Sequence, residues 1–196
     1  MKHIFFLGLI GLFLSCSGQK TNSYDGYPWV SKIQNGHPRL FFNTESFKQV
    51  RKRALNEESA LFGEINDRVD ALIGKEIVFK DSLVSDGTQN TDHEYGVRAA
   101  EAALVYLVSK DKKYLELSKN ILKKVVDYYT FRNKHGLNIQ WYAFSRINAL
   151  AAYDWIYGDL TDKERTEIGR PFLQAMNDML PSEKRKRFFR ENTGGI

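Results

Sequence analysis

The segment from residue 140 to 161, QWYAFSRINALAAYDWIYGDLT, combines alanines with aromatic and polar side chains that are suited to binding. Its apolar residues recur at helical spacing, which predicts a helix from Gln140 to Gly158. Sugar rings stack on tryptophan and tyrosine faces, and arginine forms paired hydrogen bonds to a carboxylate. Trp141, Tyr142 and Arg146 therefore indicate a surface that binds an acidic sugar.

The predicted helix has two candidate faces. Helical spacing places Trp141 with Ser145 and Asn148, and it places Tyr142 with Arg146. The candidate substrate-binding residues of this segment are Gln140, Trp141, Tyr142, Arg146 and Asn148. A place in a helical core remains the alternative for the two aromatic residues.

Two residues further along the same helix are better explained by structure than by chemistry. Buried polar groups usually have hydrogen-bond partners, so we expect Asp154 to cap a helix or to pair with Arg146. We expect Trp155 to fill space between helical layers.

His93 and Tyr95 open another predicted helix and are further candidates for substrate binding. The charged form of a histidine is disfavoured near a helix start, which suits a neutral catalytic partner, although a plain surface histidine is the alternative. The four histidines are scattered along the chain, at His3, His37, His93 and His135. Without a metal constellation, a phosphate-cradling glycine loop or a nucleophile motif, we expect neither a metal nor a cofactor.

The pattern from Ser31 onward predicts an all-α fold without alternating strands. The predicted helices cover residues 44–55, 59–77, 92–109, 111–129, 140–158 and 161–181. Thr161 and Glu164 predict a capping box at the start of the last one. Short links make the third and fourth helices, and then the fifth and sixth, into antiparallel hairpins with one apolar partner each. This arrangement predicts part of an (α/α) toroid.

The first residues predict export. Lys2, an apolar run over residues 4–14 and a small residue before Cys16 have the layout of a signal peptide. LSCS resembles a bacterial lipobox, which makes Cys16 the lipidated first residue of a periplasmic or cell-surface lipoprotein of an outer membrane; a plain signal peptide is the alternative. We expect a signal at 1–15, a polar tether at 16–36 and a domain at 37–196.

The net charge of +5 is concentrated near residues 183–191, EKRKRFFRE. A solvated helix end explains this local cluster, and nucleic acid is a poor partner for an exported protein. The last residues, RFFRENTGGI, leave Phe188, Phe189 and Ile196 without a visible core. We therefore expect the chain to be a fragment, the first half of a helical toroid, or else a truncated gene product.

Two motifs in this order resemble a known family. HPRLFF at residues 37–42, a capped helix, and then ALAAYDWIYGDLTDKER at residues 149–165 are similar to the heparinase II/III-like polysaccharide lyases of gut and soil bacteria. The resemblance covers residues 37 to 180. It implies an exported, often lipid-anchored protein that begins with an incomplete α/α toroid, followed by a β-sandwich that this chain does not contain.

The resemblance implies β-elimination on a glycan that contains uronic acid. A base removes the proton next to the carboxylate, an Asn, His or Arg neutralises that carboxylate, and a Tyr or His protonates the leaving oxygen. Asn192 is the residue near the position expected for the neutralising group. We expect the chain to lack the full catalytic set, so whether it is active by itself stays open.

Two other functions remain open. A toroidal glycoside hydrolase needs two carboxylates across a cleft, and Asp92, Glu94 and Asp154 are the available suppliers. A lipid-anchored, non-catalytic glycan-binding protein needs only the aromatic and basic surface. The residues do not choose among heparin-like, chondroitin-like and alginate substrates, nor do they predict an oligomeric state.

Overall fold

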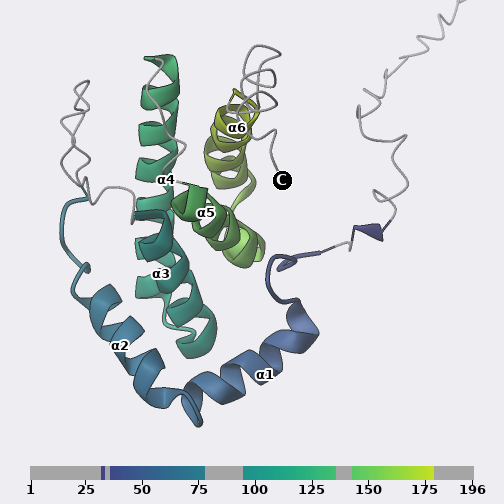
Figure 1. Cartoon of the computed structure of the whole chain (residues 1–196), viewed down its shortest axis with the longest axis vertical. Coiled ribbons are helices and arrows are strands. Elements are labelled where there is room, and N and C mark those ends of the chain that lie inside the picture. The colour runs from purple at the N-terminus through teal and green to yellow at the C-terminus, as the bar shows by residue number, and fades with distance from the viewer. Residues whose placement is uncertain (1–31, 34–35, 78–94, 136–142, 179–196) are drawn as a thin grey trace, which may run out of the picture. The chain divides into compact units, whose positions relative to one another are not determined.

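The computed structural model describes residues 32–33, 36–77, 95–135 and 143–178 (Figure 1). The chain divides into two compact units, Met1–Asn35 and Gly36–Ile196, and the helices described here belong to the second. Within these ranges the regular structure is helical and contains no strand, which confirms the predicted all-α class. Several predicted site residues lie outside the described ranges: Cys16, His93, Gln140, Trp141, Tyr142 and Asn192.

Helix α1, Thr44–Leu55, has the bounds that its sequence predicts and begins at a capping box. The side chain of Asn43 accepts from Ser46 N at 2.9 Å, and Ser46 Oγ accepts from Asn43 N at 3.0 Å. Two of the amides that a helix start leaves unpaired are thereby satisfied.

Helix α2, Ser59–Asp70, is shorter than the predicted span of 59–77. Turns follow, and Gly74 has a φ of 75°, a left-handed conformation that stops a helix and that glycine adopts without a side-chain penalty. Ile73 continues the apolar spacing of the helix but lies in these turns, where it is 40% exposed. The apolar periodicity of this segment therefore continues beyond the helix itself.

Helices α3, Tyr95–Ser109, and α4, Lys112–Lys134, form an antiparallel hairpin. Ser118 Oγ donates to the carbonyl of Ala99 at 2.9 Å, which ties the two helices together. The reversal uses Lys110, whose φ is 65° and whose N–H donates to the Tyr106 carbonyl at 2.7 Å. Helix α4 continues past the predicted end at residue 129, because neither proline nor glycine occurs before residue 136.

The second hairpin consists of α5, Ala143–Ile156, a short 3-10 helix η4, Tyr157–Asp159, and α6, Asp162–Asp178. The predicted capping box at the start of α6 is present, since Thr161 N donates to Glu164 Oε2 at 2.9 Å and Glu164 N donates to Thr161 Oγ1 at 3.2 Å. Tyr153 Oη donates to the Arg165 carbonyl at 3.2 Å and connects α5 with α6.

We call α3 and α5, the first helix of each hairpin, the inner helices. These two helices run in the same direction. Near their starts, Gly96 N donates to Ser145 Oγ at 3.1 Å, and toward the other end Tyr106, in the last turns of α3, pairs through its hydroxyl with Asp159, which follows α5. A Cβ added at Gly96 would lie 2.0 Å from the Ser145 carbonyl oxygen, so glycine permits this close approach.

We call α4 and α6, the second helix of each hairpin, the outer helices. These two helices also run in the same direction. Lys119 Nζ lies 3.1 Å from Glu164 Oε1, and the rings of Tyr129 and Phe172 are 6.3 Å apart further along. The second hairpin thus repeats the orientation of the first, helix for helix.

The core lies where α3, α4, α5 and α6 meet. Alanines line the contact between α3 and α5, which lets the two backbones approach closely, whereas larger apolar residues fill the layer between α4 and α6. The apolar stripe of α4 is buried, with 5% exposure or less, at Leu115, Ile121, Leu122, Val125 and Val126. In the described part of the chain, no helix has the length and apolar character needed to cross a membrane.

Candidate functional site

The HPRLFF loop, residues 37–42, is fastened to α5 through the carboxylate of Asp154. Oδ1 accepts from His37 Nδ1 at 2.5 Å, and Oδ2 accepts from the backbone N–H of Arg39 at 2.6 Å and of Leu40 at 2.8 Å. Asp154 is only 5% exposed. A buried carboxylate is tolerated because charged hydrogen bonds replace its lost water.

Trp155 completes the attachment of this loop. Its indole Nε1 donates to the Leu40 carbonyl at 2.8 Å, and its rings stack on Phe42 with centroids 4.7 Å apart. Phe42 in turn packs against Phe47 of α1, at 5.0 Å between ring centroids. The backbone of Leu40 is therefore held at both its N–H and its carbonyl group, and α1 is connected to α5.

The imidazole of His37 is held on its two nitrogens and on one ring face. Nε2 accepts from Arg39 Nη2 at 2.5 Å, and the Tyr157 ring stacks on the imidazole at 3.9 Å. The Arg165 guanidinium lies 4.7 Å from the Tyr157 ring, and its Nε donates to the Tyr157 carbonyl at 3.2 Å. These contacts lock the ring orientation.

The contacts of His37 define its chemistry. Arginine carries only donors, so Nε2 must accept and the proton must lie on Nδ1, facing Asp154. An Asp–His pair of this kind orients a general base when Nε2 is free to take a proton. Here Arg39 occupies that nitrogen, and the arrangement fits a structural clasp better than a catalytic dyad.

The structural interpretation of Asp154 and Trp155 agrees with these contacts, but the partners of Asp154 are not the expected ones. The sequence predicts a helix cap or an ion pair with Arg146, and the carboxylate instead binds a loop that lies 114 to 117 residues earlier in the chain. Because both of its oxygens already accept hydrogen bonds, Asp154 is poorly suited to act as a hydrolase carboxylate.

The starts of α3 and α5 bring Tyr95 and Arg146 into the same region. Gly96 N and Tyr129 Oη both donate to Ser145 Oγ, at 3.1 and 2.9 Å, and Ser145 itself is 3% exposed. Tyr95 and Arg146 are the sequence neighbours of this bonded pair, and both are half-buried.

Asn148 is also half-buried but belongs to a different side of α5. Two residues along an α-helix correspond to a rotation of about 200°, so Arg146 and Asn148 face different directions. The structure therefore does not gather these two predicted site residues on one surface.

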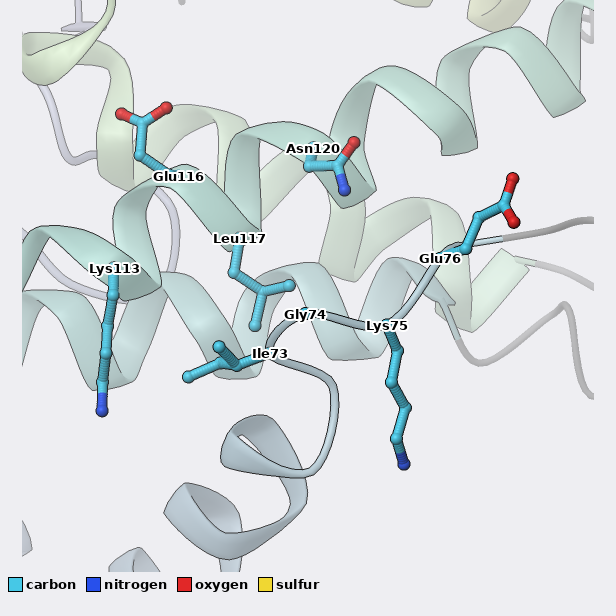
Figure 2. Close-up of a pocket in the computed structure, with 8 residues that line it drawn as sticks. All are labelled: Ile73, Gly74, Lys75, Glu76, Lys113, Glu116, Leu117 and Asn120. Atoms are coloured by element: carbon cyan, nitrogen blue, oxygen red, sulfur yellow. The ribbon is translucent and has the colours of Figure 1, made fainter.

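A shallow depression of about 440 Å³ lies between the turn after α2 and the first half of α4. It is lined by Ile73, Gly74, Lys75, Glu76, Lys113, Glu116, Leu117 and Asn120 (Figure 2). Figure 2 shows the two lysines extending to one side and the two glutamates to the other, so no set of charged groups converges there. None of the predicted site residues lines this depression.

Metal binding has no support in the described ranges, which contain no group of three or more His, Cys, Asp or Glu side chains placed to hold an ion. A second charged cluster connects α2 to α3, where Glu101 accepts from Arg68 Nη2 at 2.8 Å and from Arg98 Nη1 at 2.6 Å. This cluster explains the two charges in the otherwise apolar helix α3.

Sequence reasoning missed the link between the two motifs. The order of HPRLFF and YDWIYGDLT entered the resemblance but a contact between them did not, although each contains an ionisable residue that is costly to bury alone, His37 in the first and Asp154 in the second. That pair of polar residues within apolar segments was the available signal.

Comparison of the chain with models of known protein families, with curated proteins and with solved structures found no match in any of the three. The fold and the site define an all-helical protein in which the HPRLFF loop is clasped to an inner helix. Membership of the heparinase II/III-like lyases stays a prediction from the sequence.

Proposed function

We propose that the chain is the N-terminal region of an exported polysaccharide lyase that acts by β-elimination on glycans containing uronic acid. The observation that carries the proposal is the clasp between the two motifs behind the family resemblance. Asp154 and Trp155 of the second motif bind the backbone of Leu40 in the first, at 2.8 Å each. The resemblance thus rests on one connected unit of the fold and not on two unrelated strings.

The order of the helices supports the finer proposal of an (α/α) toroid. Each hairpin contributes one helix to an inner pair, α3 and α5, and one to an outer pair, α4 and α6, with equal directions within each pair. Hairpins that repeat in this way, with a small rotation per repeat, generate a curved wall with a concave binding surface.

The proposal assigns roles to individual residues. Tyr95 and Arg146 lie at adjoining helix starts, where an aromatic ring and a guanidinium suit a carboxylated sugar. Substrate binding is assigned to His93, Tyr95, Gln140, Trp141, Tyr142, Arg146 and Asn148. Neutralisation of the substrate carboxylate is assigned to Asn192, and attachment to a bacterial outer membrane is assigned to a lipid on Cys16.

The test is an assay of the full-length protein on heparin, chondroitin and alginate, which all present a carboxylate next to an abstractable proton. β-Elimination leaves a carbon–carbon double bond that absorbs in the ultraviolet, so rising absorbance with falling chain length supports the lyase. Chain shortening without that absorbance identifies a hydrolase and rejects the proposal. Binding without chain shortening identifies a non-catalytic glycan-binding protein and rejects it equally.

A further inference from the structure

We propose that the outer edge of the HPRLFF loop, Arg39 together with Phe41, is a subsite for one uronic-acid residue of a glycan. The sugar ring lies on Phe41 and its carboxylate pairs with Arg39. The identity of the ligand rests on the proposed function, whereas the location of the subsite rests on the geometry of the loop.

Phe41 is held in an unusual conformation and is presented to solvent. Its φ is 67°, a left-handed value that is a genuine outlier for a bulky residue, and its side chain is 73% exposed. Among the large apolar side chains in the described ranges, this is the highest exposed fraction. A phenylalanine that is strained and also excluded from the core contributes little to packing, and such strain clusters at binding sites.

The clasp maintains this conformation from both sides of Phe41. Leu40 is fixed through its N–H to Asp154 and through its carbonyl to Trp155, at 2.8 Å in each case. The next residue, Phe42, stacks on Trp155. The Phe41 ring meets Trp155 edge-on at 6.3 Å, so one aromatic side chain supports another. The exposed ring is therefore preorganised, and binding a sugar requires no further ordering.

Arg39 supplies the charge next to this ring. Its backbone N–H is bound to Asp154 at 2.6 Å, and its guanidinium donates to His37 Nε2 at 2.5 Å, which orients the exposed side chain. A guanidinium has five N–H donors. In the described part of the chain no carboxylate pairs with this guanidinium, so donors remain for a bidentate bond to a ligand carboxylate.

The spacing suits a single sugar. The Cα atoms of residues 39 and 41 are at most about 7 Å apart, which is comparable to one pyranose residue with its carboxylate. The C–H face of the sugar covers an aromatic ring, while the planar carboxylate matches the guanidinium. A neutral sugar satisfies only the first of these contacts, so the subsite selects for uronic acid.

The test measures binding of the full-length protein to oligosaccharides of chondroitin, heparin and alginate by calorimetry. The same oligosaccharides with their carboxyl groups reduced to alcohols are the matched neutral ligands. We expect the reduced forms to bind at least about tenfold more weakly, because a charged hydrogen bond is lost. Equal affinity for both forms overturns the assignment of Arg39, and tighter binding of a polyglutamate peptide of equal length overturns the choice of a glycan.

Variants test whether the acidic oligosaccharide binds at Arg39 and Phe41. Phe41→Ala and Arg39→Gln are each expected to weaken binding of the acidic oligosaccharide about tenfold. Phe41→Trp keeps a stacking face and retains binding, and Arg39→Lys retains part of it. Leu61→Ala on α2 and Arg170→Gln on α6 remove exposed side chains elsewhere and are expected to leave the affinity unchanged. Thermal unfolding of each variant separates loss of the subsite from loss of the fold.

Kinetics distinguish failure of the subsite from failure of the lyase proposal. In a protein that forms unsaturated products, Phe41→Ala is expected to raise KM about tenfold, since it removes a binding contact away from the reacting atoms. Product formation with unchanged KM and Kd in both variants overturns the subsite and leaves the lyase standing. A protein that neither binds nor cleaves the three glycans overturns both.

Discussion

His37 Nδ1 donates to the carboxylate of Asp154 at 2.5 Å, although the two residues are 117 positions apart in the sequence. Helices α1, α2, α3 and α4 and most of α5 lie within the loop that this contact closes. Closing a loop of this length costs conformational entropy, which the surrounding hydrogen bonds and aromatic stacking must offset. The contact is therefore a critical point for the stability of the described fold.

Asp154→Asn tests the clasp while preserving the size of the side chain. The variant loses the charge that supports three hydrogen bonds, and we expect the free energy of unfolding to fall by about 2–4 kcal/mol. Urea unfolding followed by circular dichroism near neutral pH gives this value. The exposed Asp127→Asn on α4 is the control and is expected to change stability by less than about 0.5 kcal/mol. Equal urea midpoints for the two variants would contradict the clasp.

Gly96→Ala tests the close approach of α3 and α5. An added methyl group would meet the Ser145 carbonyl oxygen at 2.0 Å, so the helices must separate, at a cost of about 2–3 kcal/mol. Gly63 also lies within a helix, α2, but has no atom within 4 Å of an added Cβ. Gly63→Ala is therefore expected to stabilise the protein by about 0.5–1 kcal/mol. The melting temperature is expected to fall in Gly96→Ala and to rise in Gly63→Ala. A Gly96→Ala variant that is more stable than the wild type would refute the close contact between α3 and α5.

Lys110→Gly tests the left-handed turn between α3 and α4. Lys110 has a φ of 65°, which glycine adopts without a steric penalty, so the replacement is expected to stabilise the protein by about 0.5–1 kcal/mol. Part of this gain is offset by the loss of the Lys110 ammonium, 5.5 Å from the Tyr106 ring. Lys123→Gly inside α4 is the matched control and is expected to lose about 1 kcal/mol. Thermal unfolding compares the stability of the two variants. A loss of stability in both would argue against the left-handed turn at Lys110.

The ionisation of Glu164 makes the stability of the folded protein depend on pH in the acid range. Accepting the Thr161 backbone N–H, together with the bond to the Lys119 ammonium, lowers its pKa from 4.5 to about 2. A pKa lowered by folding means that the stabilisation is fully present above the ordinary pKa and is lost as the pH falls toward 2. Glu164→Gln is therefore expected to cost about 1–2 kcal/mol near neutral pH, after allowance for solvent screening, and almost nothing near pH 2.

Glu167→Gln is the control for this titration. Its carboxylate is 49% exposed on the same helix and lies 3.7 Å from Lys163. An exposed pair of this kind contributes about 0.5 kcal/mol or less. Urea midpoints measured across the acid range are expected to converge for Glu164→Gln and wild type at low pH. If the urea midpoints of Glu164→Gln and wild type differed by the same amount at every pH, the proposed ionisation of Glu164 would be excluded.

Much of the helical architecture is predictable from local pattern. Asn43 with Ser46, and Thr161 with Glu164, mark helix starts because each cap is completed within four residues of chain. The end of α2 is not predictable in this way, since the apolar spacing runs on to Ile73 although the helix ends at Asp70 and turns lead from there to the left-handed Gly74. Ile73 keeps the apolar spacing and is nevertheless 40% exposed, so apolar spacing alone does not locate the end of a helix.

The candidate site is less predictable, because its contacts join distant segments. Nothing adjacent to Asp154 indicates that its partners begin at His37, and Arg146 was the more obvious cation because it lies on the same helix. Phe41 was equally inaccessible to pattern reading, since a phenylalanine in an apolar string is expected to be buried. Its left-handed backbone follows from the tertiary attachment of its neighbours.

The chemistry of bond cleavage tests the central claim most directly. The full-length protein digests a uronic-acid glycan that it cleaves, in water labelled with heavy oxygen. Mass spectrometry of the products then shows whether solvent oxygen enters them. β-Elimination predicts unsaturated ends and no incorporated label, because no water is added across the bond. Label at the newly formed ends, or intact polymer after prolonged digestion, would contradict the assignment as a lyase.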